Sequence, residues 1–247
     1  MIKLTLPERP AELTDELQSQ LTEKFKINCN DDVWNDTRIK NAIRNTLLNM
    51  THSKCAYSEQ PLSVMEIDHF KCKSIYKDDV VKWGNLLPSC RKCNSAKSDH
   101  DVVAEPIINP LIDNPKDFLY VKSFRFYPRN NSVKGKTTID VLDINDKDCF
   151  EKPRAETCFD TAEKIENLFD LLQCATSNTK RRNVISKIKS ALEACGPKYE
   201  YSAVISTYIL YEYPTYQELE NYLRDNNLWD SDFDTIKQTL EEIAMPK

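Results

Sequence analysis

One stretch of this chain, residues 51–105, contains all three histidines and the only closely spaced pair of cysteines, Cys90 and Cys93. The C-x-x-C spacing is typical of a metal knuckle, in which two thiolates from one turn bind the same ion. The chain has nine cysteines, and their irregular spacing argues against a disulfide framework. We expect most of the others to be buried thiols that behave as small apolar residues.

The composition favours a mainly helical protein. Only three glycines occur in 247 residues, whereas average usage of about 7% would give roughly seventeen. We predict an α+β fold in which a small core of two short strands and a helix is embedded in a mainly helical protein. Four regions are expected: an N-terminal helical scaffold (1–50), the core (51–105), a loop and β-hairpin extension (106–150), and a C-terminal helical region for docking or regulation (151–247).

Hydrophobic periodicity and turn signals place the elements within these regions. Helices are predicted near Ala11–Phe25 and Asp36–Met50 in the first region. In the core, short strands at Val64–Ile67 and Asn85–Pro88 precede a helix from about Arg91 to Asp99. The pattern then predicts strands at Phe118–Tyr127 and Thr137–Leu142, and helices from Arg154 onward, including Tyr201–Tyr211, Thr215–Leu228 and Asp232–Ala244.

The charge is unevenly distributed along the chain. The net charge is −5, whereas a protein that binds nucleic acid alone is usually basic. From Lys71 to Lys97, however, seven cationic residues face two acidic ones, a net +5. From Glu212 to Lys247, nine acidic residues face three cationic ones, a net −6. The core is therefore locally basic, and the acidic C-terminal stretch is either a solvated face or a surface for a basic partner.

We expect neither a signal peptide nor a membrane-spanning helix in this sequence. The first residues, MIKLTLPERPAEL, lack the apolar core of a signal peptide. No stretch approaches the ~20 apolar residues that a membrane-spanning helix needs. We therefore expect a soluble, cytoplasmic protein with no membrane partner.

The core contains the residue types that phosphodiester hydrolysis requires. Asp68 and His69 are adjacent, and a loop after a strand could turn both toward one site. The carboxylate suits Mg²⁺ or Mn²⁺, and the imidazole suits general-base catalysis near neutral pH. Asn94, at the start of the predicted helix, could complete the cation site. Asn85 could hold the loop after His69 by backbone hydrogen bonds, and Lys97 could either meet the scissile phosphate or be solvated.

The cysteines suggest a second, structural site. Cys55, Cys90 and Cys93 could bind zinc, but Ser58 occupies the position where a second C-x-x-C pair would have its other thiolate. A serine hydroxyl is a poor zinc ligand, so Cys72, His52 or a water would have to fill the fourth position. Alternatively, no zinc binds and the thiols pack as apolar groups.

Taken together, the pattern EIDHF…KS…W.NLLPSC..CNSAK.D resembles the HNH endonuclease family. This resemblance implies that the core at 51–105 has the ββα-metal (HNH) fold. More narrowly, the pattern is similar to the PtuB-type nucleases of Septu and retron-associated anti-phage systems. Further similarities are the early Arg9-Pro10 turn, the CAYSE segment at 55–59, the NP..D.P pattern at 109–115, and the segment Thr138–Asn145. The resemblance covers about residues 1–155.

This resemblance implies a role for each matching residue. His69 matches the general base, Asp68 and Asn94 match the ligands of one catalytic Mg²⁺ or Mn²⁺ ion, and Asn85 matches the middle asparagine of the motif. Cys55, Cys90 and Cys93 match structural zinc ligands, and Ser58 departs from the fourth. The residues expected to contact phosphates without reading sequence are Lys73, Arg91, Lys92 and Lys97.

The resemblance also implies partners and leaves the substrate open. The partners would be an ABC/SMC-like ATPase of the PtuA type and, in some systems, a retron reverse transcriptase with its DNA–RNA product. We expect a toxic effector of anti-phage defence that cleaves DNA. One alternative is an effector that cleaves tRNA or other RNA. A second alternative is a non-catalytic zinc-knuckle adaptor, which would have no need of Asp68, His69 or Asn94.

Overall fold

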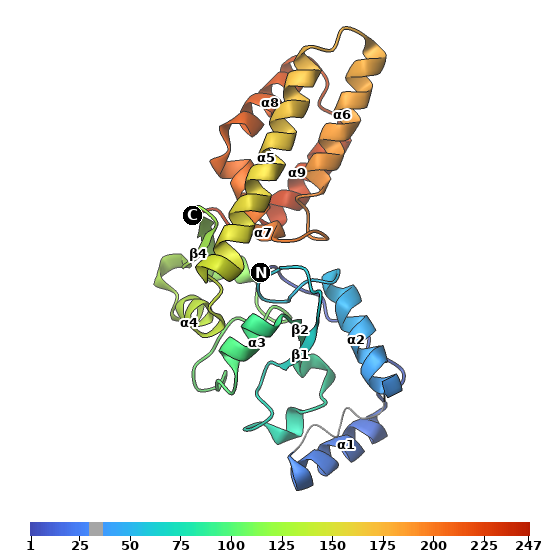
Figure 1. Ribbon diagram of the computed structural model, residues 1–247, viewed down its shortest axis with the longest axis vertical. Coiled ribbons are helices and arrows are strands. Elements are labelled where there is room, and N and C mark those ends of the chain that lie inside the picture. The colour runs from blue at the N-terminus through green and yellow to red at the C-terminus, as the bar shows by residue number, and fades with distance from the viewer. Residues whose placement is uncertain (30–36) are drawn as a thin grey trace. The chain divides into compact units, whose positions relative to one another are not determined.

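A computed structural model describes residues 1–29 and 37–247 (Figure 1). The chain is an α+β protein, mainly helical with two small pairs of antiparallel strands, as the composition predicts. It divides into two compact units. The first comprises residues 1–118 and 128–144, and the second comprises residues 119–127 and 145–247.

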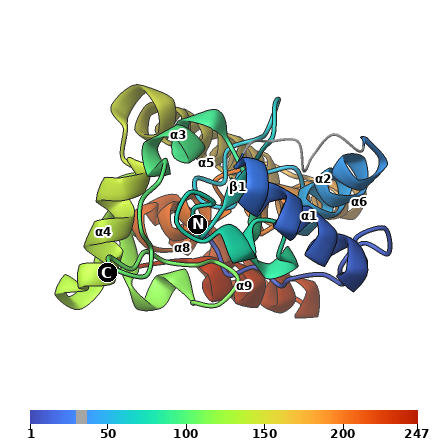
Figure 2. The ribbon, with the colours of Figure 1, turned by 90° about the horizontal axis from the view of Figure 1, so that it is seen from below.

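The first unit contains a two-stranded sheet and a short helix that follows it directly. Strand β1 (Glu66–His69) pairs antiparallel with β2 (Leu86–Ser89), so that Asp68 lies opposite Leu87 and His69 opposite Leu86. Helix α3 (Arg91–Lys97) begins two residues after β2 and packs against β1 and α4 (Val133–Leu142). Both views place α3 beside α4 (Figures 1 and 2). The loop between the strands contains two 3₁₀ turns, Lys77–Asp79 and Trp83–Asn85.

Two N-terminal helices complete this unit. Helix α1 (Asp15–Asn28) starts at the N-cap Thr14, whose hydroxyl accepts a hydrogen bond from Leu17 N. Helix α2 (Thr37–Thr51) packs against β2, while Asp36, its predicted first residue, lies outside the described residues. The apolar side of α2 and the sheet share one buried cluster: Leu13, Ile39, Ile43, Leu47, Met65, Trp83 and Leu86. Burial of α2 thereby fixes one wall beside β1.

The second unit is a helical bundle with a small hairpin. Strands β3 (Leu119–Lys122) and β4 (Arg125–Pro128) form the hairpin. The long helix α5 (Lys152–Gln173) packs against α6 (Asn178–Glu193) and α7 (Ser202–Thr207). Helices α8 (Pro214–Asp225) and α9 (Ser231–Ile243) follow, and α9 packs against α6 and α7. One apolar side of α5 is buried, at Ile165, Leu168, Phe169 and Leu172.

Two strand predictions after the core are wrong. Thr137–Leu142 lies in helix α4, because Ser132 caps the helix by accepting a hydrogen bond from Gly135 N, and the Thr138 hydroxyl donates back to the Lys134 carbonyl. The β-branched residues there mimic a strand. Phe118–Tyr127 is not one strand but a hairpin, with a turn at Ser123 and Phe124, which both have positive φ.

The core elements are displaced slightly from their predicted positions. Strand β1 begins two residues later than predicted, so Asp68 and His69 are its last two residues. Helix α3 ends at Lys97 and not at Asp99. Among the described residues, no helix is long and apolar enough to cross a membrane.

The buried cluster beneath α2 generates a stability prediction. Leu47 is fully buried there, so Leu47→Ala should lower the free energy of unfolding by about 2–5 kcal/mol. Ile27, which is 81% exposed, provides the control, because Ile27→Ala should change it by less than about 0.5 kcal/mol. Urea denaturation followed by tryptophan fluorescence measures both. Equal effects of the two variants would contradict the assignment of this core.

Candidate functional site

The carboxylate of Asp68 is held from two sides at the end of β1. Asp68 is only 3% exposed. Its Oδ1 accepts a hydrogen bond from Lys97 Nζ at 3.0 Å, and its Oδ2 accepts one from the Tyr57 hydroxyl at 2.5 Å. Burial raises the pKa of Tyr57 well above its usual value, as does the neighbouring Asp68 charge, so the hydroxyl remains a donor. A carboxylate offers about four lone-pair sites, so two stay available for a cation.

The side chain of Lys97 points into the protein and not toward solvent. We predicted that it meets the scissile phosphate or is solvated, but its side chain is buried in the unit. Its Nζ donates to Asp68 Oδ1 and, at 2.7 Å, to the His69 carbonyl. Lys97 therefore joins α3 to the end of β1 and compensates the charge of Asp68.

His69 is the last residue of β1 and lines the same pocket as Asp68. Burial lowers its pKa to about 4, against the opposing effects of the Asp68 charge and a hydrogen bond with the Val80 backbone. The imidazole is therefore neutral near pH 7. A neutral imidazole has a nitrogen lone pair that can accept a proton, which is what a general base requires.

Asn94 reaches the pocket from helix α3, where a neighbouring acid orients it. Its Nδ2 donates to Glu66 Oε2 at 2.7 Å. Because a carboxylate can only accept hydrogen bonds, the nitrogen faces Glu66 and the amide oxygen lies on the other side of the group. Sequence reasoning missed Glu66, although it stands two residues before Asp68 on the same strand and hence on the same face of the sheet.

Asn85 is buried behind the pocket and does not line it. Its Oδ1 accepts from Lys71 N at 2.8 Å, and its Nδ2 donates to the carbonyls of Lys71 and Asp79 at 3.1 and 3.0 Å. The Asn85 carbonyl also accepts from Phe70 N. These bonds tie the loop after His69 to the start of β2, which fixes the direction in which the chain leaves the strand.

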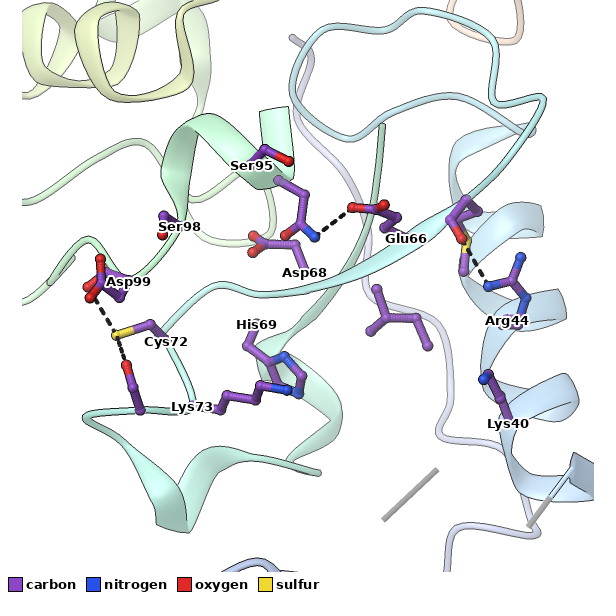
Figure 3. Close-up of a pocket in the computed structure, with 14 residues that line it drawn as sticks. Lys40, Arg44, Glu66, Asp68, His69, Cys72, Lys73, Ser95, Ser98 and Asp99 are labelled. Carbon is purple, nitrogen blue, oxygen red and sulfur yellow. Dashed lines mark hydrogen bonds between the residues drawn. The ribbon is translucent and has the colours of Figure 1, made fainter. Parts of the chain in front are cut away.

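A pocket of about 840 Å³ lies in front of these residues (Figure 3). Asp68, His69 and Asn94 line it together, as does Glu66. The opposite wall is formed by Lys40 and Arg44 of helix α2, which the sequence analysis regarded only as scaffold. No local motif distinguishes these two residues, because only the packing of α2 on β2 brings them to the pocket.

The other three predicted phosphate-binding cations occupy different positions. Lys73 lines the pocket. Arg91 has an 89% exposed side chain, and its Nε lies 3.6 Å from Glu66 Oε1. Lys92 forms an ion pair of 2.7 Å with Asp143, at the end of α4. Lys92 thus connects α3 to α4, and of the four predicted cations only Lys73 borders the pocket.

The three predicted zinc ligands converge beside α3. The sulfur atoms of Cys55, Cys90 and Cys93 lie within 4.8 Å of one another, and all three residues are buried. The C-x-x-C pair is positioned by the helix itself, because Cys90 is the N-cap of α3 and its sulfur accepts from Cys93 N. Two hydroxyls also face the cluster: Ser58 Oγ lies 3.8 Å from Cys90 Sγ, and Ser89 Oγ lies 3.8 Å from Cys55 Sγ.

These residues fit a metal such as zinc. Burial opposes ionisation of the Cys55 thiol, but hydrogen bonds from Cys90 and Cys93 outweigh it and lower its pKa well below the usual value. Zinc binds sulfur as the thiolate, at about 2.3 Å. A bound zinc ion would therefore also favour ionisation of the remaining thiols. Cys72 is not a fourth ligand, because its sulfur donates to the Asp99 carbonyl and lines the pocket instead.

The fold and these two groups define an α+β protein with a polar pocket on one side of a two-stranded sheet and a thiol cluster beside the following helix. Comparison with known proteins identifies the family of this chain. The chain is 34% identical to the Septu protein PtuB of Bacillus thuringiensis over 98% of its own length and 94% of the relative's. The chain therefore belongs to the Septu PtuB family.

A second relative is more distant. It is a Septu protein PtuB of Bacillus mycoides (strain KBAB4), 25% identical over 52% of this chain and 55% of the relative. No family model matches the chain. Membership of the PtuB family agrees with the resemblance deduced from the motifs.

The thiol cluster generates a prediction about zinc. Ser58→Cys should add a fourth thiolate, because Ser58 already faces Cys90. Zinc should then be lost to a chelator at least about tenfold more slowly, since structural sites favour four good ligands. Cys93→Ser should accelerate the loss, and Cys72→Ser, outside the cluster, should leave it unchanged. Elemental analysis and a colorimetric chelator assay measure this. Protein purified without zinc, and unable to take it up, would indicate that the thiols pack as apolar groups.

Proposed function

We propose that this protein is a metal-dependent endonuclease of the HNH type that hydrolyses phosphodiester bonds of nucleic acid, with DNA as the preferred substrate. The observation that carries the proposal is the gathering of Asp68, His69 and Asn94 around one pocket, from β1 and from α3. A carboxylate, a neutral imidazole and an amide are the groups that a one-metal hydrolytic site uses. An adaptor built only on the thiol cluster would have no need of this pocket.

Each residue has a defined task in the proposed reaction. His69 removes a proton from the attacking water. Asp68 and Asn94 would hold Mg²⁺ or Mn²⁺, which supplies positive charge to the phosphate and to the departing oxygen. Tyr57 and Lys97 fix the carboxylate of Asp68, and Asn85 fixes the loop that begins at His69. Lys73 and Arg91 contact phosphates of the substrate without reading its sequence.

The cellular role follows from the family. We propose that the chain is an effector of anti-phage defence that acts in a complex with an ABC/SMC-like ATPase of the PtuA type. In some systems a retron reverse transcriptase and its DNA–RNA product would be present as well. A partner that itself binds nucleic acid would explain how a nuclease with a net charge of −5 can bind its substrate. The helices of the second unit serve docking or regulation.

Removal of the general base tests the proposed reaction directly. His69→Ala should lower the cleavage rate by about 10²–10⁴-fold, the usual contribution of general-base catalysis. His100→Ala is the matched control, because His100 lies outside the residues that line the pocket. Plasmid DNA and total tRNA, each with Mg²⁺ or Mn²⁺, would be given to the chain alone and with its ATPase partner. Cleavage that His69→Ala leaves unchanged would refute the mechanism.

The Glu66–Asn94 hydrogen bond generates a second prediction. Glu66→Ala should raise the Mg²⁺ concentration needed for half-maximal cleavage, because the amide of Asn94 loses the group that orients it. Glu66→Gln should stay close to the wild type, since the glutamine oxygen accepts the same hydrogen bond. If Glu66→Gln were as impaired as Glu66→Ala, the charge of Glu66 would matter, and Glu66 would act as a metal ligand instead.

A further inference from the structure

The pocket has two walls of different chemistry. Asp68, His69 and Asn94 belong to the wall made by β1 and α3, whereas Lys40 and Arg44 belong to helix α2. Arg44 is four positions after Lys40 along the helix, so the two cations lie on the same face. In Figure 3 both side chains extend from α2 on the side of the pocket away from Cys72 and Asp99. The wall formed by Lys40 and Arg44, the α2 wall, is thus cationic. The end of the pocket away from this wall carries the acid Asp99.

The position of Arg44 is fixed by the fold. Its Nη1 donates to the Met65 carbonyl at 2.8 Å, immediately before β1 begins. A guanidinium has five N–H donors in a planar fork, so most of them remain for a second partner after this bond is made. Lys40 is exposed at the rim, and neither cation forms an ion pair with an acid among the described residues. Both charges are therefore available to an anion in the pocket.

The remaining charges of the pocket favour an anion on this wall. Lys97 compensates Asp68 from within the unit. Glu66 accepts a hydrogen bond from Asn94 and lies near Arg91. Of the cations expected to bind phosphates, Lys97 is buried and Lys92 is paired with Asp143. Apart from Lys73, the cations that border the pocket are those of α2.

We infer that the α2 wall, formed by Lys40 and Arg44, binds the phosphate backbone of the nucleic acid on one side of the scissile bond. The inference rests on the proposed function and names a binding surface for it. When one phosphodiester lies at His69, the neighbouring phosphates of the backbone lie along α2. There the two cations neutralise these phosphates without reading bases. Helix α2 thus acts as the substrate-binding wall of the pocket in addition to burying the core.

The salt dependence of binding tests this surface separately from catalysis. The protein is the 247-residue chain carrying His69→Ala, and the probes are a fluorescein-labelled DNA duplex and a labelled tRNA. Anisotropy is measured over a series of NaCl concentrations. Each phosphate contact to a duplex contributes about 0.9 to the slope of log affinity against log salt, and each contact to a single strand about 0.7. Lys40→Glu and Arg44→Gln should each flatten the slope by about that amount and weaken binding equally across sequences.

The variants are chosen to leave the fold intact. Lys40 is exposed, and the glutamine in Arg44→Gln still carries an N–H donor for the Met65 carbonyl. Lys136→Glu is the matched control, because Lys136 is an exposed lysine of the same unit that does not line the pocket. Thermal melting of all variants identifies any that are destabilised. Should Arg44→Gln be destabilised, Lys40→Glu still decides the outcome.

The possible results separate the two proposals. A flatter slope for Lys40→Glu but not for Lys136→Glu supports the α2 wall, and the duplex and tRNA arms identify the nucleic acid that it prefers. Equal slopes for Lys40→Glu, Arg44→Gln and Lys136→Glu overturn it, even if His69→Ala abolishes cleavage. Conversely, a flatter slope in a protein whose cleavage does not depend on His69 would preserve the surface and refute the proposed mechanism.

Discussion

The buried ion pair between Lys97 and Asp68 organises the pocket. Lys97 comes from the end of α3, and its ammonium contacts both the Asp68 carboxylate and the His69 carbonyl at the end of β1. Each ion of a buried pair stabilises the other, because removal of one partner lowers the free energy of unfolding by about 3–5 kcal/mol. The pair therefore fixes the register of α3 against β1, and with it the distance between Asn94 and the two strand residues. The hydroxyl of Tyr57 completes the support of Asp68.

The thiol cluster supports the same arrangement from the other end of α3. Cys90 caps the helix, Cys93 lies in its first turn, and Cys55 reaches them from the segment before β1. Tyr57 is two residues after Cys55, so the segment that supplies a thiol to the cluster also supplies the hydrogen bond to Asp68. A metal at the cluster would thus stiffen the pocket without taking part in chemistry.

Local chemistry made part of this molecule predictable. The C-x-x-C spacing and the adjacent Asp68 and His69 are short-range patterns. Cys90 and Cys93 lie together as that spacing predicts, and Cys55 joins them as the incomplete second pair at Cys55 and Ser58 suggests. The failures come from long-range effects. Lys97 looked like a surface cation, but a partner 29 residues earlier in the sequence draws it inside. In the sequence, Lys40 and Arg44 do not differ from the charged residues of an ordinary solvated helix face. Only tertiary packing places them at the pocket. The segment Thr137–Leu142 has the β-branched residues of a strand, yet the Ser132 cap and the hydroxyl of Thr138 favour a helix.

In the proposed reaction, Asp68 and Asn94 hold a divalent cation within reach of His69. The most direct measurement is a crystal structure of the His69→Ala protein with Mn²⁺ and uncleaved nucleic acid, in which anomalous scattering locates the manganese. We predict one manganese peak in contact with both the Asp68 carboxylate and the Asn94 amide oxygen, with a backbone phosphate beside it. Manganese bound elsewhere, or a phosphate backbone that avoids this pocket, would contradict the account.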